Sequence, residues 1–137
     1  MNLPHVAVIM GGLSSEHEVS LKSGAMVAGS LDRARFRVTP VVITRTGEWK
    51  FPGEAVLSMG AGLTRLGEEQ VDCVFLALHG PFGEDGRMQG LLDLLDIPYT
   101  GSGCAASALA MDKIRSKAVV RDAGLRVAKE AILHRHE

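Results

Sequence analysis

The N-terminal segment joins an apolar run to a glycine pair and a polar turn: Val6-Ala7-Val8-Ile9-Met10-Gly11-Gly12-Leu13-Ser14-Ser15-Glu16-His17-Glu18. The run is continuously apolar and partly β-branched, which predicts a strand buried on both faces. The glycines end this strand, and we expect a helix beyond Ser15 with Val19, Met26 and Leu31 near one apolar face. A strand, a glycine turn and a helix in this order are typical of an α/β fold.

The same alternation continues along the chain. Further strands are predicted over residues 36–43, through Trp49 and Phe51, over 71–78, over 97–100 and from residue 125 to 128. Pro40 removes a hydrogen-bond donor from its strand and favours a sheet edge or a bulge. Residues 53–70 are rich in glycine and weak in periodicity, and they allow a helix around residues 55–58.

Three helices are predicted in the second half, over residues 87–96, 104–111 and 113–123. The first carries a core-facing stripe at i, i+3, i+4 and i+7, made of Met88, Leu91, Leu92 and Leu95. Asp112 predicts the N-cap of the last helix and Gly124 its C′ position. Alternating strands and helices favour a mostly parallel sheet with right-handed crossovers and ligands beyond the carboxyl ends of the strands.

Composition excludes several classes of protein. The 137 residues suit one domain, with an expected net charge of −1 and no dense basic run, so we expect neither nucleic acid nor membrane as a partner. No apolar stretch approaches the roughly 20 residues of a membrane span. Cys73 and Cys104 stand outside any C-x-x-C pair and are interpreted as reduced core residues. These features favour the cytoplasm.

The first polar loop, Gly11–Glu18, offers glycines and the N-terminus of a helix, a combination that attracts anions. It also carries Glu16 and Glu18, which would repel a phosphate and attract an ammonium. Ser15 and Glu18 have the spacing of a capping box, whereas Glu16 is open to a capping or a binding role. The loop lacks the Gly-x-Gly-x-x-Gly fingerprint, and no acidic residue ends the second strand, so a nicotinamide enzyme is not expected.

The second polar loop, His79–Gly86, follows the strand over 71–78. His79 would face the ligand crevice, where it could donate to a carboxylate or a phosphate or be satisfied by backbone carbonyls. Glu84 and Asp85 cap the next helix or, with weaker support, bind a metal. Lys113 opposes the dipole of its helix, a local mismatch that fits either a function or a surface ion pair.

Four segments together closely resemble D-alanine–D-alanine ligases, which are ATP-grasp enzymes: Gly11–Gly24, His79–Gly86, Tyr99–Gly103 and Met111–Lys113. They occur in the family's order and at its spacing. The resemblance implies a Rossmann-like, pre-ATP-grasp domain of three layers over residues 1–111. It also implies that residues 112–137 begin the central ATP-grasp domain.

The resemblance also implies roles. Glu16 would receive the ammonium of the first D-alanine, Val19 would line the pocket for its methyl group, and His79 would lie near the substrate carboxylate and the transferred phosphate. Glu16 and His79 are thus the catalytic candidates, and Lys113 would reach the phosphates of ATP. No residue of this chain is assigned to a metal.

The reaction implied is phosphoryl transfer from ATP to the first D-alanine, followed by attack of the second D-alanine on the acyl phosphate, with Mg²⁺ or Mn²⁺ on the nucleotide. Members of the family continue well beyond position 137, so we expect this chain alone not to catalyse ligation. A homodimer is the expected assembly. Two alternatives stay open. The acceptor could be D-lactate, or the chain could be a non-catalytic binding or oligomerisation module.

Overall fold

A computed structural model describes residues 3–133 of the chain. Its sheet contains β1 (His5–Gly11), β2 (Arg37–Ile43), β3 (Trp49–Lys50) and β4 (Cys73–Leu76) in the order β3-β2-β1-β4. β1 pairs in parallel with both β2 and β4, and only β3 runs antiparallel to its neighbour. A parallel bridge between Val74 and Tyr99 continues the sheet beyond β4. The predicted mostly parallel sheet is confirmed.

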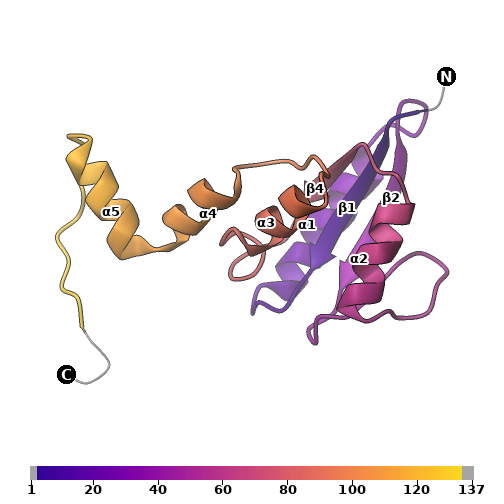
Figure 1. Ribbon diagram of the computed structural model, residues 1–137, viewed down its shortest axis with the longest axis horizontal. Coiled ribbons are helices and arrows are strands. Elements are labelled where there is room, and N and C mark those ends of the chain that lie inside the picture. Colours follow the sequence, from indigo (N-terminus) through magenta and orange to yellow (C-terminus); the bar gives the residue numbers. More distant parts are fainter. Residues whose placement is uncertain (1–2, 134–137) are drawn as a thin grey trace.

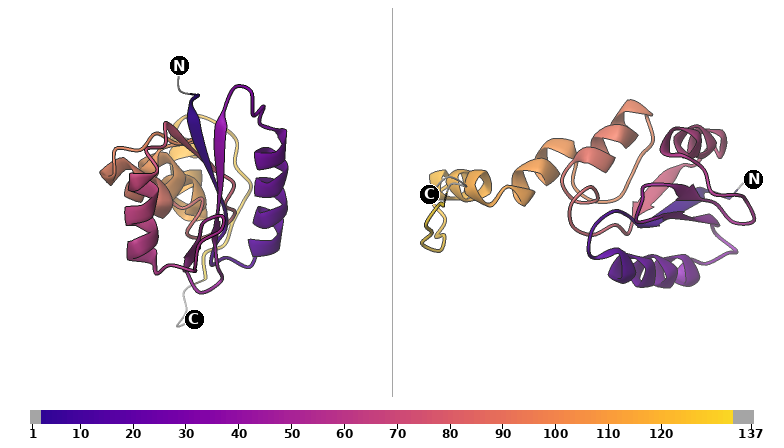
Figure 2. Two further views of the ribbon diagram at one scale, coloured as in Figure 1. Left: turned by 90° about the vertical axis from the view of Figure 1, so that its right-hand side faces the viewer. Right: turned by 90° about the horizontal axis from the view of Figure 1, so that it is seen from below.

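Helices cover both faces of this sheet (Figure 1). They are α1 (His17–Ser30), α2 (Met59–Glu68), α3 (Arg87–Leu94), α4 (Cys104–Met111) and α5 (Lys113–Asp122). Figure 2 shows α1 on one face of the sheet and α2 on the other. Alternate residues of β1 accordingly enter two cores: Ile9 packs with Leu66 of α2 and Leu92 of α3, whereas Met10 packs with Ala28 of α1. The three layers and the α/β class are as predicted.

The buried face of α1 differs from the prediction. Val19 is 54% exposed and Met26 67% exposed, whereas the helix buries His17, Ser20, Gly24 and Ala28. The helix lies so close to β1 that a side chain at position 24 would collide with Met10. Small and polar residues therefore form the most buried part of the contact surface, with Leu21 and Val27 packed partly buried beside them.

Two other elements were placed wrongly. The predicted helix around residues 55–58 is absent, because Leu57 bridges to Trp49 and Ser58 caps α2 by accepting from the N–H of Ala61. Residues 125–128 form no strand, because no strand lies beside them to pair with. Pro40 causes no bulge, since the β1–β2 register is unbroken, but β3 reaches only Val42 and Ile43, so Pro40 borders an open sheet edge as expected.

The C-terminal elements extend away from the sheet (Figure 1). Asp112 caps α5 as predicted, by accepting from the N–H groups of Ile114 and Arg115, and Gly124 follows the helix with a φ of 79°.

Between residues 3 and 133, no helix combines the length and the apolar character needed to cross a bilayer. Cys73 and Cys104 are free thiols, and burial raises the pKa of Cys73.

The segment after α5 is fastened to it by Glu130, whose carboxylate lies 3.0 Å from Lys117 Nζ and 3.2 Å from Arg121. The hydrogen bond from Lys117, and then that from Arg121, lowers the pKa of Glu130. A carboxylate whose pKa is lower in the folded state stabilises that state at neutral pH, and the effect is lost as pH falls through the folded-state pKa. Acidification should therefore reduce the protection of α5 amides from hydrogen exchange, and Glu130→Gln should abolish this pH response.

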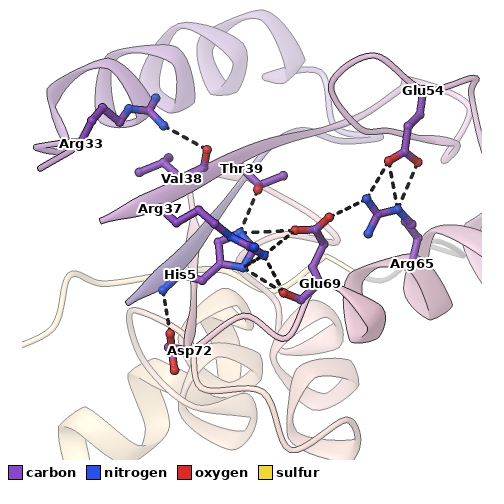
Figure 3. A network of polar contacts seen from close by, with 9 residues as sticks. All are labelled: His5, Arg33, Arg37, Val38, Thr39, Glu54, Arg65, Glu69 and Asp72. Carbon is purple, nitrogen blue, oxygen red and sulfur yellow. Dashed lines mark hydrogen bonds and ion pairs between the residues drawn. The ribbon is translucent and has the colours of Figure 1, made fainter. Parts of the chain in front are cut away.

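A polar network closes the amino-terminal edge of the sheet (Figure 3). His5 is 3% exposed; its backbone N–H donates to Asp72 at 2.7 Å, and its Nε2 lies 2.8 Å from Thr39 Oγ1. Arg37 and Arg65 both pair with Glu69, and hydrogen bonds to Glu54 and Glu69 raise the pKa of Arg65. This network joins the end of α2 to β1 and β2. His5 is therefore structural and lies opposite the candidate site.

Candidate substrate site at the carboxyl ends of β1 and β4

The two polar loops leave neighbouring parallel strands at the same edge of the sheet. A buried serine ties these strand ends to α1: Ser20 Oγ accepts from the N–H of Gly11 at 2.8 Å and donates to the carbonyl of Ala77 at 2.7 Å. Gly11 and Gly12 both have a φ of 90°, which turns the chain from β1 toward α1. The two hydrogen bonds of Ser20 thus hold the strand ends and the first turn of α1 together.

Glu16 presents a carboxylate in this edge. It is the N-cap residue of α1, yet its side chain makes no capping hydrogen bond, and within residues 3–133 it forms no ion pair. A Cβ atom on Gly80 would lie 2.5 Å from Glu16 Oε2. The first loop therefore packs directly on the second, and the carboxylate of Glu16 lies beside the residue that follows His79.

The predicted capping box is wrong. Ser14, not Ser15, provides the local hydroxyl, and it accepts from the N–H of Glu16 at 2.9 Å. Glu18 pairs with Arg45 at 3.0 Å on the surface. Of the two candidate acids, only Glu16 is left to act on a ligand.

The two carboxylates of the His79–Gly86 loop form hydrogen bonds within the loop. Glu84 accepts from the N–H of Gly80 at 2.7 Å, and Asp85 accepts from the N–H of Phe82 at 2.9 Å and pairs with Arg87. Gln89 is 5% exposed and donates to the carbonyl of Gly83 at 2.9 Å. These bonds fix the shape of the loop, so the carboxylates of Glu84 and Asp85 both accept hydrogen bonds from within it.

His79 is half-buried and turned toward α1. Its Nε2 lies 3.1 Å from Ser23 Oγ, one helical turn after Val19. The structure thus brings Glu16, Val19 and His79 to one side of the sheet edge. Next to this loop lies a cavity of about 350 Å³, which Gln89 lines together with Ser102 and Ser107.

Lys113 is not part of this group. It is exposed in the first turn of α5, which stands apart from the sheet in Figure 1. Nothing in the fold of residues 3–133 brings its ammonium to the loops.

Sequence reasoning missed Ser20, Ser23 and Gln89. A usable signal existed for the first of them. Ser20 shares a helical face with His17 and Gly24, and a buried polar residue must find hydrogen-bond partners. Ser23 and Gln89 carry no comparable signal, because their partners depend on tertiary structure.

The chain is similar to known ligases along most of its length. A family model described as D-ala D-ala ligase N-terminus matches residues 5–102. A D-alanine–D-alanine ligase of Citrifermentans bemidjiense is 50% identical over 132 residues, which are 96% of this chain and 38% of that protein. One of Sinorhizobium fredii is 48% identical over 137 residues, with 40% of its length covered.

Solved structures of related ligases resemble the fold of this chain. The D-alanine–D-alanine ligase of Coxiella burnetii superposes with a TM-score of 0.79 at 30% identity, over 94% of this chain and 44% of that one. The VanG D-Ala:D-Ser ligase of Enterococcus faecalis gives a TM-score of 0.77 at 34% identity, over 93% and 44% of the two chains. The chain thus spans about two fifths of the length of its relatives. The chain belongs to the D-alanine–D-alanine ligase family, and residues 5–102 correspond to the family's N-terminal domain.

Proposed function

We propose that this chain is the N-terminal part of a cytoplasmic, ATP-dependent ligase that joins two D-alanines through an acyl phosphate for peptidoglycan synthesis. Residues 1–111 are assigned to the substrate domain and residues 112–137 to the start of the central ATP-grasp domain. The observation that carries the proposal is the carboxylate of Glu16, which is exposed and unpaired in the described chain and lies beside the His79 loop. A lone carboxylate at a sheet edge suits an ammonium ligand.

Three residues are assigned to the first D-alanine. Glu16 receives its ammonium, Val19 contacts its methyl group, and His79 lies near its carboxylate and the phosphate transferred to it. The exposure of Val19 supports its role, because an apolar side chain at a helix surface is available to a ligand. Positioning and electrostatic stabilisation are the contributions expected of such a site.

ATP and its metal are assigned mainly to parts of the ligase beyond this chain, with Lys113 reaching the phosphates. No three side chains of His, Cys, Asp or Glu gather into a possible metal site among residues 3–133. The donors present therefore do not fit a Mg²⁺ or Mn²⁺ site, and no step is assigned to a metal here. The chain alone is proposed to be inactive in ligation.

The acceptor substrate has one specific alternative. The solved D-Ala:D-Ser ligase superposes about as well as the solved D-alanine–D-alanine ligase of Coxiella burnetii, so this fold accompanies more than one acceptor. A D-lactate acceptor is a further alternative of the same kind. Competition among D-alanine, D-serine and D-lactate in the intact ligase distinguishes the three.

A homodimer is part of the proposal. Several apolar side chains are exposed on α4 and α5, among them Leu109, Met111, Ile114 and Val119. A second copy or the remainder of the ligase would cover them. A non-catalytic oligomerisation module would use the same surface. Sedimentation with and without D-alanine and ATP distinguishes the two, because the association of such a module would not respond to either ligand.

The proposal is tested by Glu16→Gln in the intact ligase. Gln keeps the size of the side chain and removes its charge, and a charge-assisted hydrogen bond contributes about 1.5–3 kcal/mol. The KM for the first D-alanine should therefore rise at least about tenfold. Steady-state kinetics with varied D-alanine at saturating ATP measure it.

Glu18→Gln is the matched control, because Glu18 lies two residues further along, in the first turn of α1, and pairs with Arg45 on the surface. Because an exposed ion pair contributes about 1 kcal/mol or less, the fold should be intact and the KM unchanged within about twofold. Equal KM values for the two variants would contradict the role of Glu16.

A further inference from the structure

Ser23 connects α1 to the ring of His79. Its Oγ lies 3.0 Å from the carbonyl oxygen of Val19, one turn earlier in the helix, and 3.1 Å from His79 Nε2. Both distances are those of hydrogen bonds. Ser23 thus contacts both Val19 and His79, two of the residues assigned to the first D-alanine.

The direction of both bonds follows from the inventory of donors. A hydroxyl has one proton to donate, and a carbonyl oxygen can only accept. The proton of Ser23 therefore points to Val19, and its Oγ accepts from His79. Both contacts are satisfied together only when Nε2 of His79 carries a proton.

We propose that Ser23 is a positioning residue that holds the proton of His79 on Nε2 and leaves Nδ1 as the atom that meets the ligand. His79 is half-buried, and its Nδ1 forms no hydrogen bond within residues 3–133 and is not fully buried. When the ring is neutral, Nδ1 can only accept a hydrogen bond; when it is protonated, Nδ1 donates one. A carboxylate or phosphate therefore contacts this nitrogen favourably only when the ring is an imidazolium.

This inference rests on the proposed function for its ligand, but the hydrogen bond itself does not. Nitrogen NMR of the ¹⁵N-labelled 137-residue chain tests the bond directly, because the two neutral tautomers give distinct correlations between ring nitrogens and carbon-bound ring protons. We expect the neutral ring to carry its proton on Nε2, with that proton protected from exchange with water. A proton on Nδ1 would overturn the inference.

Two variants tie the signal to Ser23. Ser23→Ala should abolish the exchange protection of the imidazole proton, whereas Ser23→Thr should keep it, since the Thr hydroxyl makes the same bond to the carbonyl four residues earlier. Unchanged protection in Ser23→Ala would also overturn the inference. Thermal melting of each variant shows that the fold is retained.

Kinetics of the intact ligase then test the link to catalysis. Ser23→Ala should raise the KM for the first D-alanine about threefold to tenfold, the effect of one hydrogen bond, and Ser23→Thr should restore it. Ser30→Ala is the matched control, because Ser30 donates to the carbonyl of Met26 four residues earlier, as Ser23 does to Val19, but lies about two turns further along α1. An equal effect of Ser30→Ala would make the role of Ser23 purely structural. The expected NMR result beside an unchanged KM would refute the proposed function at His79 while supporting the hydrogen bond.

Discussion

Gly24→Ala is expected to lower the free energy of unfolding by about 2 kcal/mol, whereas Gly29→Ala on the same helix is expected to raise it by up to about 1 kcal/mol. A Cβ atom at position 24 would lie 2.5 Å from Met10 Cβ and 2.8 Å from its Sδ. Met10 is buried in the core beneath α1, so it has little room to move. At position 29 a Cβ would meet nothing within 4 Å.

The sign of the difference is the informative result. Both substitutions give the helix the same gain in intrinsic propensity, so packing alone separates them. Urea denaturation followed by far-ultraviolet circular dichroism measures both free energies. If Gly24→Ala were as stable as Gly29→Ala, the close approach of α1 to β1 would be incorrect.

Gly80→Ala is the second variant with a large expected effect. Gly80 has a φ of 69°, and a Cβ there would lie 2.5 Å from Glu16 Oε2 and 3.0 Å from Ser14 Oγ. The methyl group must displace the carboxylate of Glu16 or the loop that carries His79. Because a displacement of about 1 Å in a catalytic group costs roughly a hundredfold in rate, kcat/KM for the first D-alanine should fall by about that factor in the intact ligase.

Gly53→Ala separates strain from displacement. Gly53 has a φ of 75°, close to that of Gly80, but a Cβ there would meet nothing within 4 Å. Both variants should lose about 1–3 kcal/mol of stability through backbone strain. Only Gly80→Ala should lose activity, and an equal loss in both would attribute the effect to folding.

The sheet was predictable because the sequence pattern of its inner strand is recognisable without any tertiary information. β1 is an inner strand buried on both faces, so its sequence is a continuous apolar run that requires no tertiary information to recognise. β4 lies beside it and has a similar apolar run, from Cys73 to Leu76. α2 was misplaced because its glycines weaken the periodicity, and one of them, Gly62, lies against the ring of Trp49. Local sequence patterns identify elements that bury large side chains. They miss close contacts that form because a glycine has no side chain.

The site was predictable to the same degree. Glu16 and His79 follow parallel strands, and the carboxyl ends of such strands share one edge, so their proximity follows from topology. The hydrogen bonds that hold the site do not. Ser15 and Glu18 have the spacing of a capping box, but Arg45 offers Glu18 a partner that only the folded chain brings near.

The burial of Trp49 in β3, where it packs against Gly62 of α2, determines which part of the protein its fluorescence reports. Trp49 is the only tryptophan in the sequence, and its ring stacks on that of Phe51 with centroids 6.5 Å apart. No Phe, Tyr or Trp occurs after Tyr99. Intrinsic fluorescence therefore follows the sheet and α2 alone and is blind to α4 and α5, whereas the circular dichroism of helices records all of them. A gap between the two melting curves would show that the C-terminal helices unfold separately from the sheet.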